Sequence, residues 1–167
     1  MKPATSPLDR RRIVQDISRV TRDPPHGVQA SPFADSMMHC HAIIHGPEDT
    51  IWECGTFHLI ISFTEDYPAF PPKVRFLSRL FHPNVYVDGR ICIDILQNQW
   101  SAMYDIAAVL TSIQSLLSDP NPHSPANPQA AKVFVENREE YDRLVLQCVE
   151  DSWSVPTLPE GILNGDR

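Results

Sequence analysis

Along the first half of the chain, the pattern of apolar and polar residues changes from helical to strand-like. Apolar residues recur every three or four positions behind a Ser-Pro helix start, which predicts a helix over residues 7–22. Four short apolar or alternating runs follow, bounded by Gly, Pro and Asp turns. They predict an antiparallel meander of four strands, over residues 27–31, 39–45, 56–63 and 74–77.

The helical period returns in the second half. An apolar stripe predicts a helix over residues 106–117, which ends before Asp119-Pro120. Asn127-Pro128 indicates the start of a short helix, and Asn137 with Glu140 resembles the capping box of a last one. One helix, a small antiparallel sheet and then further helices are typical of an α+β fold.

The length of 167 residues suits one domain with a core of its own. We expect that domain to span residues 1–153, with Cys148 and Trp153 in the core. Periodicity is lost from about Val155, so we expect residues 154–167 to form a loose C-terminal tail.

Composition and charge narrow the classes of function. No apolar stretch approaches the roughly 18 residues that cross a bilayer, and no secretory signal is visible, so we expect an intracellular protein without a membrane partner. The net charge of −7 argues against direct binding of nucleic acid. Four cysteines without a CxxC pair are typical of thiols in a cytosolic chain and not of a disulfide framework.

Histidines on the second predicted strand raise the question of a metal site. His39, His41 and His45 share one face of that strand, beside Cys40. At ~3.3 Å per residue, His39 and His45 lie about 20 Å apart, too far for one ion to join them. We therefore expect no metal site.

The chemistry is expected in a long segment between the last strand and the helix at 106–117. It has no predicted regular structure, and loops of that length in a compact domain are usually functional. It contains Cys92 between two isoleucines. Such a cysteine, taken alone, is more often a small buried hydrophobic residue. Asn84 lies upstream across an Asp-Gly turn, which would bring its amide back toward the thiol.

Two kinds of reactive thiol remain open from these residues. A cysteine protease needs a histidine base, and His82 is the nearest candidate, although its position beside Pro83 suits a bracing role equally well. A thiol that accepts an acyl group from another thioester needs no such base. It needs a donor for the tetrahedral oxyanion, and the Asn84 amide is suitable.

The order of these residues resembles the active-site signature of ubiquitin-conjugating enzymes. His82-Pro83-Asn84 is followed by Cys92 eight residues after Asn84, and then by Asp94 and Trp100. Further matches to the family, over residues 7–153, are Gly46-Pro47 with Thr50, Gly55-Thr56-Phe57, Tyr67-Pro68 with Pro71-Pro72, and Asp119-Pro120-Asn121-Pro122. The resemblance implies that residues 1–153 form a ubiquitin-conjugating catalytic domain.

Within the family, the chain is most similar to the subgroup of post-replication DNA repair and histone H2B ubiquitination. The residues that carry this likeness are Arg10-Arg11-Arg12, Gly27-Val28, Ala30-Ser31-Pro32, Asp94-Ile95-Leu96-Gln97-Asn98, the stretch 110–116, and Ser124-Pro125-Ala126-Asn127. It implies a histone or a sliding clamp as substrate, and work in both cytoplasm and nucleus.

The resemblance also implies roles at the site. Cys92 accepts ubiquitin as a thioester from an activating enzyme and passes it to a lysine amine, with a RING-type ligase. Asn84 holds the oxyanion or braces the loop. Asp94 orients or deprotonates the amine, or else caps a turn at the surface. Ser124 lies in the gating loop, where some relatives carry an acid, and phosphorylation would supply that charge.

Three contact surfaces follow from the same resemblance. They comprise Arg10, Arg11 and Arg12 for the activating enzyme, Ala69, Phe70 and Ala102 for the ligase, and Gln29 and His41 for noncovalent ubiquitin on the back of the sheet. A solvated helix face remains the alternative for the arginines, as does a solvated sheet face for the last pair. Ala69-Phe70 and Ser101-Ala102 depart from the common ligase-binding pattern, which leaves the choice of ligase open.

No cofactor is expected on this protein, since ATP is consumed by the upstream activating enzyme, and a monomer is expected. Two rival interpretations share the fold. One is a conjugating enzyme for a ubiquitin-like modifier. The other is a noncatalytic ubiquitin-binding scaffold, against which the presence of Cys92 and Asn84 counts.

Overall fold

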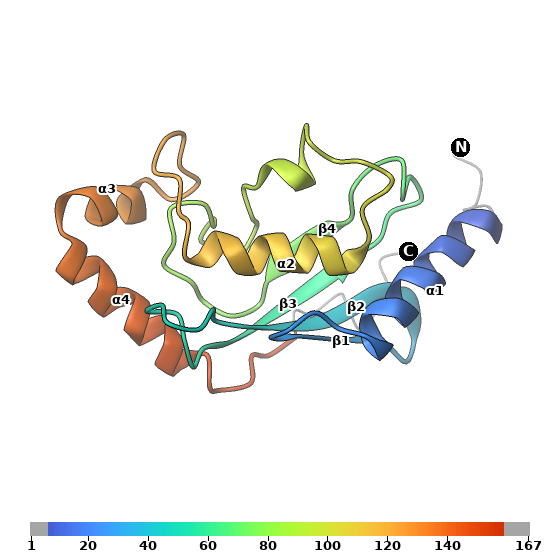
Figure 1. Ribbon diagram of the computed structural model, residues 1–167, viewed down its shortest axis with the longest axis horizontal. Coiled ribbons are helices and arrows are strands. Elements are labelled where there is room, and N and C mark those ends of the chain that lie inside the picture. Colours follow the sequence, from blue (N-terminus) through green and yellow to red (C-terminus); the bar gives the residue numbers. More distant parts are fainter. Residues whose placement is uncertain (1–6, 159–167) are drawn as a thin grey trace.

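The computed structural model describes residues 7–158 and has the expected α+β architecture (Figure 1). In chain order its elements are α1 (Pro7–Arg22), β1 (Val28–Phe33), β2 (Ser36–His45), β3 (Thr56–Ser62), β4 (Lys73–Phe76), the 3-10 turn η1 (Asp94–Leu96), α2 (Ile106–Leu117), α3 (Pro128–Glu136) and α4 (Arg138–Asp151). The two long predicted helices keep their predicted bounds. The strands shift by up to three residues at their ends.

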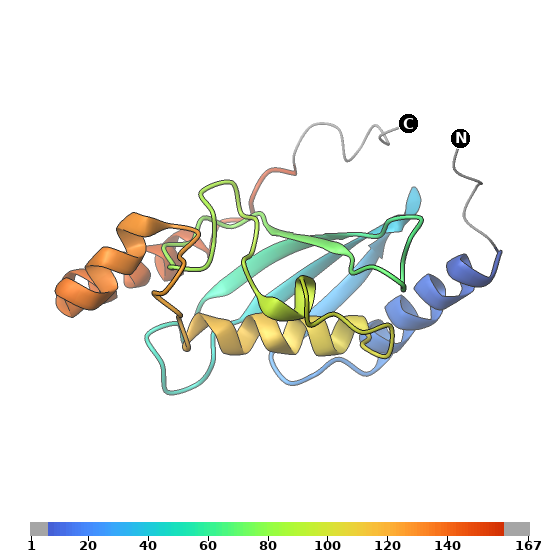
Figure 2. The ribbon, with the colours of Figure 1, turned by 90° about the horizontal axis from the view of Figure 1, so that it is seen from above.

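The sheet is an antiparallel meander in the order β1-β2-β3-β4. Helix α2 lies across one face, with α1 beyond one end of the sheet and α3 and α4 beyond the other (Figure 2). The apolar stripe of α2 is buried in one core with inward residues of the strands, such as Ile44 and Leu59. The opposite face of the sheet, here called the outer face, carries His41 on β2 and Arg75 on β4.

The C-terminal end of the domain contains one correction to the sequence analysis. Cys148 is buried as expected, but Trp153 is 62% exposed and does not belong to the core. Helix α4 ends at Asp151, and the Ser152 hydroxyl accepts a hydrogen bond from the Thr56 N–H at the start of β3. The chain therefore turns outward, and the Trp153 indole N–H donates to the Cys54 carbonyl at 2.8 Å on the surface.

Residues 154–158 of the expected tail form no helix or strand, and its remaining residues lie outside the described range. No helix within residues 7–158 combines the length and apolar character needed to span a membrane.

Candidate active site

Cys92 lies at the end of a tight hairpin over residues 84–92, here called the active-site hairpin. The Cys92 N–H donates to the Asn84 carbonyl at 2.8 Å, and the Tyr86 N–H donates to the Arg90 carbonyl at 2.9 Å. The turn of the hairpin is closed by a hydrogen bond from the Gly89 N–H to the Tyr86 carbonyl at 2.9 Å. The expectation that an Asp-Gly turn would bring Asn84 back to Cys92 is therefore confirmed at the backbone.

Glycine is required at position 89 because the hairpin is anchored there to the sheet. Gly89 has φ +94°, and its carbonyl accepts a 2.9 Å hydrogen bond from the Phe76 N–H of β4. A Cβ at this position would lie 2.1 Å from the Phe76 carbonyl oxygen, closer than any real contact. The sheet thus fixes the position of the hairpin that carries the thiol.

His82, the nearest histidine, braces this segment and is not a base for the thiol. It is fully buried, and its Nε2–H donates to the Leu116 carbonyl at 2.8 Å, while its Nδ1 accepts from the Asn84 N–H at 2.9 Å. Burial lowers the pKa of His82 to about 4, against a weaker opposing effect of the hydrogen bond to Leu116. Both ring nitrogens are occupied and the ring is neutral, so the mechanism of a histidine-activated protease has no base here.

The Asn84 side chain joins the hairpin to the loop after α2. Its amide Nδ2 donates to the Asn121 carbonyl and its Oδ1 accepts from the Asn121 N–H, both at 2.8 Å. The side chain is almost completely buried. Since an amide nitrogen carries two hydrogens, one N–H remains for another acceptor. The bracing role therefore coexists with an oxyanion role, which stays a prediction.

Ser124 lies in the loop that Asn121 helps to fix. After Ser124, the N–H groups of Ala126 and Asn127 donate to the Pro83 carbonyl at 2.8 Å and 3.0 Å, and before it Asn121 is bonded to Asn84, so the loop is held on both sides of Ser124. Ser124 itself is exposed and has φ +58°, which is uncommon for serine. The exposed hydroxyl is accessible to a modifying enzyme, as the phosphorylation hypothesis needs.

The four thiols differ in their surroundings. Burial raises the pKa of Cys40 to about 11 and also raises that of Cys148, so both favour the protonated form. Cys54 is exposed on the turn before β3, whereas Cys92 is partly exposed. Gln97, which sequence analysis did not single out, places its Nε2 3.9 Å from the Cys92 sulfur. Only Cys92 combines access with an anchored polar loop.

Asp94 begins the η1 turn two residues after the thiol. Its backbone carbonyl accepts from the N–H groups of Gln97 at 2.9 Å and Gln99 at 3.0 Å. This turn directs the chain back, which explains how Gln97 reaches Cys92. The Asp94 side chain is exposed, and its role toward an incoming amine stays a prediction.

The ligase contacts are expected on the turn at residues 67–72 and on the loop at 100–103, and these two segments, the second extended to residue 104, are here called the docking loops. The Trp100 indole N–H donates to the Pro68 carbonyl at 2.9 Å and so joins them. Phe70 is 64% exposed on the first loop, next to exposed Ala69, and Ala102 is exposed on the second. All three predicted ligase contacts are therefore accessible.

Arg12 holds the docking loops to α1. Its guanidinium donates to the carbonyls of Ala102 at 2.8 Å and Tyr104 at 2.9 Å, and to the Asp16 carboxylate at 2.8 Å. The Tyr67 hydroxyl donates to the same carboxylate. Burial, together with the bond to Asp16, raises the pKa of Tyr67, which stays protonated as a donor.

The arginines predicted to contact the activating enzyme thus divide into two kinds. Arg10 and Arg11 are exposed, whereas the Arg12 guanidinium is occupied inside the chain. On the outer face of the sheet, Gln29 is exposed and the His41 Nε2 lies 2.9 Å from the His58 Nδ1. Burial lowers the pKa of both histidines.

Comparison with known proteins agrees with this geometry. The model of the ubiquitin-conjugating enzyme family matches residues 12–149. Ubiquitin-conjugating enzyme E2 3 of Arabidopsis thaliana is 59% identical over 144 residues, which are 86% of this chain and 96% of that protein. Ubiquitin-conjugating enzyme E2 1 of Caenorhabditis elegans is 56% identical over 144 residues, 86% of this chain and 75% of the relative.

Proposed function

The chain belongs to the ubiquitin-conjugating enzyme family, whose members are cysteine thioester acyltransferases, and from this we propose that Cys92 is the cysteine that carries ubiquitin. The observation that carries the assignment is the active-site hairpin, which holds a partly exposed thiol beside the backbone of Asn84. Such enzymes work with ubiquitin, an activating enzyme and a ligase. Of the remaining three cysteines, Cys40 and Cys148 are buried and Cys54 is exposed on the turn before β3.

The first step is transthioesterification. The Cys92 thiolate attacks the carbonyl of the thioester between ubiquitin and the activating enzyme, a new C–S bond forms, and the thiolate of the activating enzyme leaves. In the second step a lysine amine attacks the same carbonyl, the C–N bond forms and the Cys92 thiolate leaves with the electron pair. The amine releases a proton, for which exposed Asp94 or water is the acceptor.

Both steps pass through a tetrahedral oxyanion, and we assign its stabilisation to Asn84. The second N–H of its amide supplies the donor, while the two bonds to Asn121 fix the amide plane. A preorganised donor of this kind costs no reorientation when the charge develops.

We assign each partner to a different surface of the protein. Arg10 and Arg11 offer two free cations to the activating enzyme, while Phe70 and Ala102 on the docking loops offer accessible side chains to a RING-type ligase. Gln29 and His41 on the outer face are assigned to noncovalent ubiquitin. The subgroup motifs favour a histone or a sliding clamp as substrate, in nuclear DNA repair and chromatin modification.

Regulation at Ser124 is the least direct of these assignments. A serine at neutral pH cannot act as a base, and phosphorylation would place about two negative charges on the pinned gating loop. An inactive Ser124→Asp variant beside a fully active Ser124→Ala variant would argue against a useful added charge.

A charging assay tests the proposed function. The protein is incubated with activating enzyme, Mg-ATP and ubiquitin, and the products are separated without reductant. We expect an adduct one ubiquitin heavier that disappears with a thiol reductant, remains in Cys54→Ala and is absent in Cys92→Ala. An adduct with a ubiquitin-like modifier alone would retain the chemistry and change the pathway. No adduct with any modifier would favour the scaffold interpretation.

A further inference from the structure

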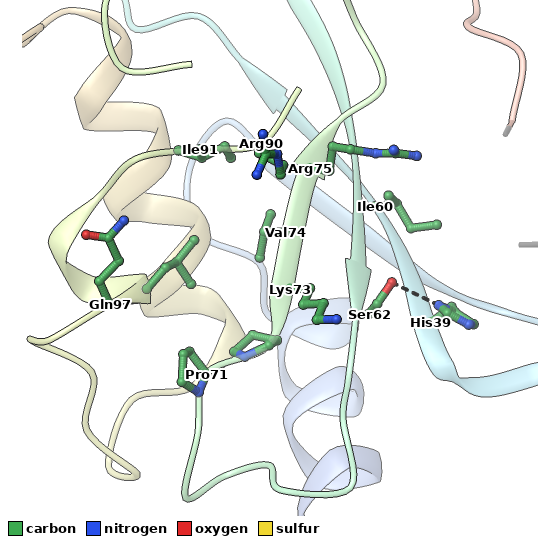
Figure 3. A pocket seen from close by; sticks show the side chains of 12 residues that line it. His39, Ile60, Ser62, Pro71, Lys73, Val74, Arg75, Arg90, Ile91 and Gln97 are labelled. Carbon is green, nitrogen blue, oxygen red and sulfur yellow. Dashed lines mark hydrogen bonds between the residues drawn. The ribbon is translucent and has the colours of Figure 1, made fainter. Parts of the chain in front are cut away.

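A groove of about 580 Å³ lies over β4, next to the active-site hairpin (Figure 3). Its apolar floor is formed by the partly exposed Pro71 and Leu96, beside the buried Ile60, Val74 and Ile91 of β3, β4 and the hairpin. Lys73, Arg75 and Arg90 supply cationic side chains around it. Here it is called the basic groove.

The charge of the basic groove is opposite to that of the whole protein. The chain carries a net charge of −7, yet none of the residues that line the groove is an aspartate or a glutamate. Among the described residues, no carboxylate lies within ion-pair distance of Lys73 or Arg75. Arg90 is paired with Asp88 at 2.8 Å at the rim, and Asp88 also attracts Arg75 from beyond ion-pair distance, so Lys73 and Arg75 form no ion pair among the described residues.

The groove is connected to the reactive thiol by covalent and noncovalent contacts. Ile91 immediately precedes Cys92, and Gln97, which lines the groove, places its Nε2 3.9 Å from the Cys92 sulfur. Arg75 and Arg90 face each other across an isolated β-bridge at one end of the groove, and Lys73 lies toward the other end (Figure 3). A chain bound here would pass beside a thioester on Cys92.

We propose that the basic groove binds the acceptor protein, and that it recognises an acceptor segment in which an apolar side chain is flanked by carboxylates. The apolar side chain packs on Pro71 and Leu96, and the carboxylates pair with Lys73 and Arg75. The segment thereby brings its own lysine to the thioester from the side of Gln97. This inference rests on the proposed function, because it needs ubiquitin on Cys92.

The composition of the groove favours a polypeptide over a nucleic acid. A phosphate backbone would use the cations but would leave the apolar floor without a partner. An extended peptide presents successive side chains on alternate sides, so it fills an apolar floor and reaches rim charges at the same time. Two unpaired cations are also few for a polyanion, whose affinity grows with each phosphate that is neutralised.

Single-turnover discharge provides the test. The protein is charged with ubiquitin, activation is stopped, and transfer is followed to two short peptides with one lysine each. One peptide has an apolar residue flanked by Asp and Glu, and the other has Asn and Gln in their places. We expect the charged form of the protein to use the acidic peptide about tenfold more efficiently, and added salt to reduce that preference.

Charge-reversal variants test whether the preference for the acidic peptide arises in the basic groove. Lys73→Glu and Arg75→Glu should abolish it, while thioester formation and discharge to free lysine stay unchanged. Lys132→Glu, which makes the same charge change on exposed α3, should keep the preference. Equal use of both peptides by the unmodified protein would overturn the proposal, as would the same loss in Lys132→Glu. Failure of charging itself would instead reject the proposed function.

Two other occupants would give different results. Inhibition of peptide transfer by a short single-stranded oligonucleotide at physiological salt, abolished by Lys73→Glu, would assign the groove to nucleic acid and overturn the proposal. Deletion of residues 159–167 that raises use of the acidic peptide in the unmodified protein but not in Lys73→Glu would assign it to the last segment of this chain.

Discussion

The active-site hairpin and the docking loops are both irregular segments, but different forces hold them. Neutral groups fix the hairpin: the Asn84 amide, the His82 imidazole and the backbone of Gly89. The docking loops depend on the charged guanidinium of Arg12. Charges near the thioester would perturb the developing oxyanion, whereas a surface that binds partners tolerates them. The groups that support the active-site hairpin are therefore uncharged, whereas the docking loops are held by a charged guanidinium.

The largest expected effect comes from removing the central support of the hairpin. His82→Ala deletes two buried hydrogen bonds and leaves a void beside Trp52, whose ring centroid lies 5.9 Å from that of His82. We expect unfolding by urea to report a loss of about 3–4 kcal/mol. The exposed His123→Ala should cost less than about 0.5 kcal/mol. Similar losses in both variants would contradict the bracing role.

A substitution at Asn84 distinguishes its bracing role from its role as an oxyanion donor. Asn84→Asp keeps the acceptor for the Asn121 N–H but removes the amide donor. We expect discharge to free lysine to fall about 100-fold, as for other oxyanion donors, in stopped single-turnover assays. Asn121→Ala is the matched control, since it retains the backbone bonds and the Asn84 amide. Normal discharge by Asn84→Asp would show that the side chain only braces.

The neutral state of His82 predicts a specific pH dependence. Its pKa is about 4 when folded and about 6.5 when unfolded, so the unfolded chain binds the proton first as pH falls. Stability from this residue is complete above pH 6.5 and is lost progressively toward pH 4. Between pH 5 and 6 its share of the slope approaches 1.4 kcal/mol per pH unit. In His82→Ala, the free energy of unfolding should change less steeply with pH over the same range, by close to 1.4 kcal/mol per pH unit, which corresponds to one bound proton. Equal slopes would contradict the buried neutral ring.

The smallest effect is expected at the docking loops. Arg12→Lys keeps the charge but cannot donate to both the Ala102 and Tyr104 carbonyls in the geometry of a planar guanidinium. We expect about a fivefold loss of discharge stimulated by a RING-type ligase, because the surface at Ala102 shifts. Discharge to free lysine should stay unchanged. Arg11→Lys, at an exposed position, should retain the stimulation. A loss in unstimulated discharge would contradict the separation of the two regions.

Sequence patterns were sufficient where one segment decides its own structure. The apolar stripes over 7–22 and 106–117, and the turn at Asp88-Gly89, depend on residues close in sequence. The sequence also predicted that Asn84 and Cys92 would come together, because one short turn joins them. The Asn137 cap of α4 is of the same kind, with its side chain accepting from the Glu140 N–H.

Features that join distant segments were not predictable. The two carbonyls that accept from the Arg12 guanidinium lie about ninety residues away, so a triplet of arginines gives no sign that one of them holds distant loops. Trp153 was misassigned because its partner, the Cys54 carbonyl, lies in a turn that no periodicity reveals. The basic groove combines β3, β4 and the hairpin, and Gln97 reaches Cys92 only through the η1 turn.

The central claim, that ubiquitin is carried on the sulfur of Cys92, is tested most directly by changing the atom that forms the bond. In Cys92→Ser the same charging reaction should produce an oxygen ester, which resists thiol reductants and is cleaved by mild alkali. The unmodified protein should give an adduct that a thiol reductant removes at once. If the adduct of Cys92→Ser remained sensitive to reductant, ubiquitin would be attached to another cysteine, and the assignment of Cys92 would be wrong.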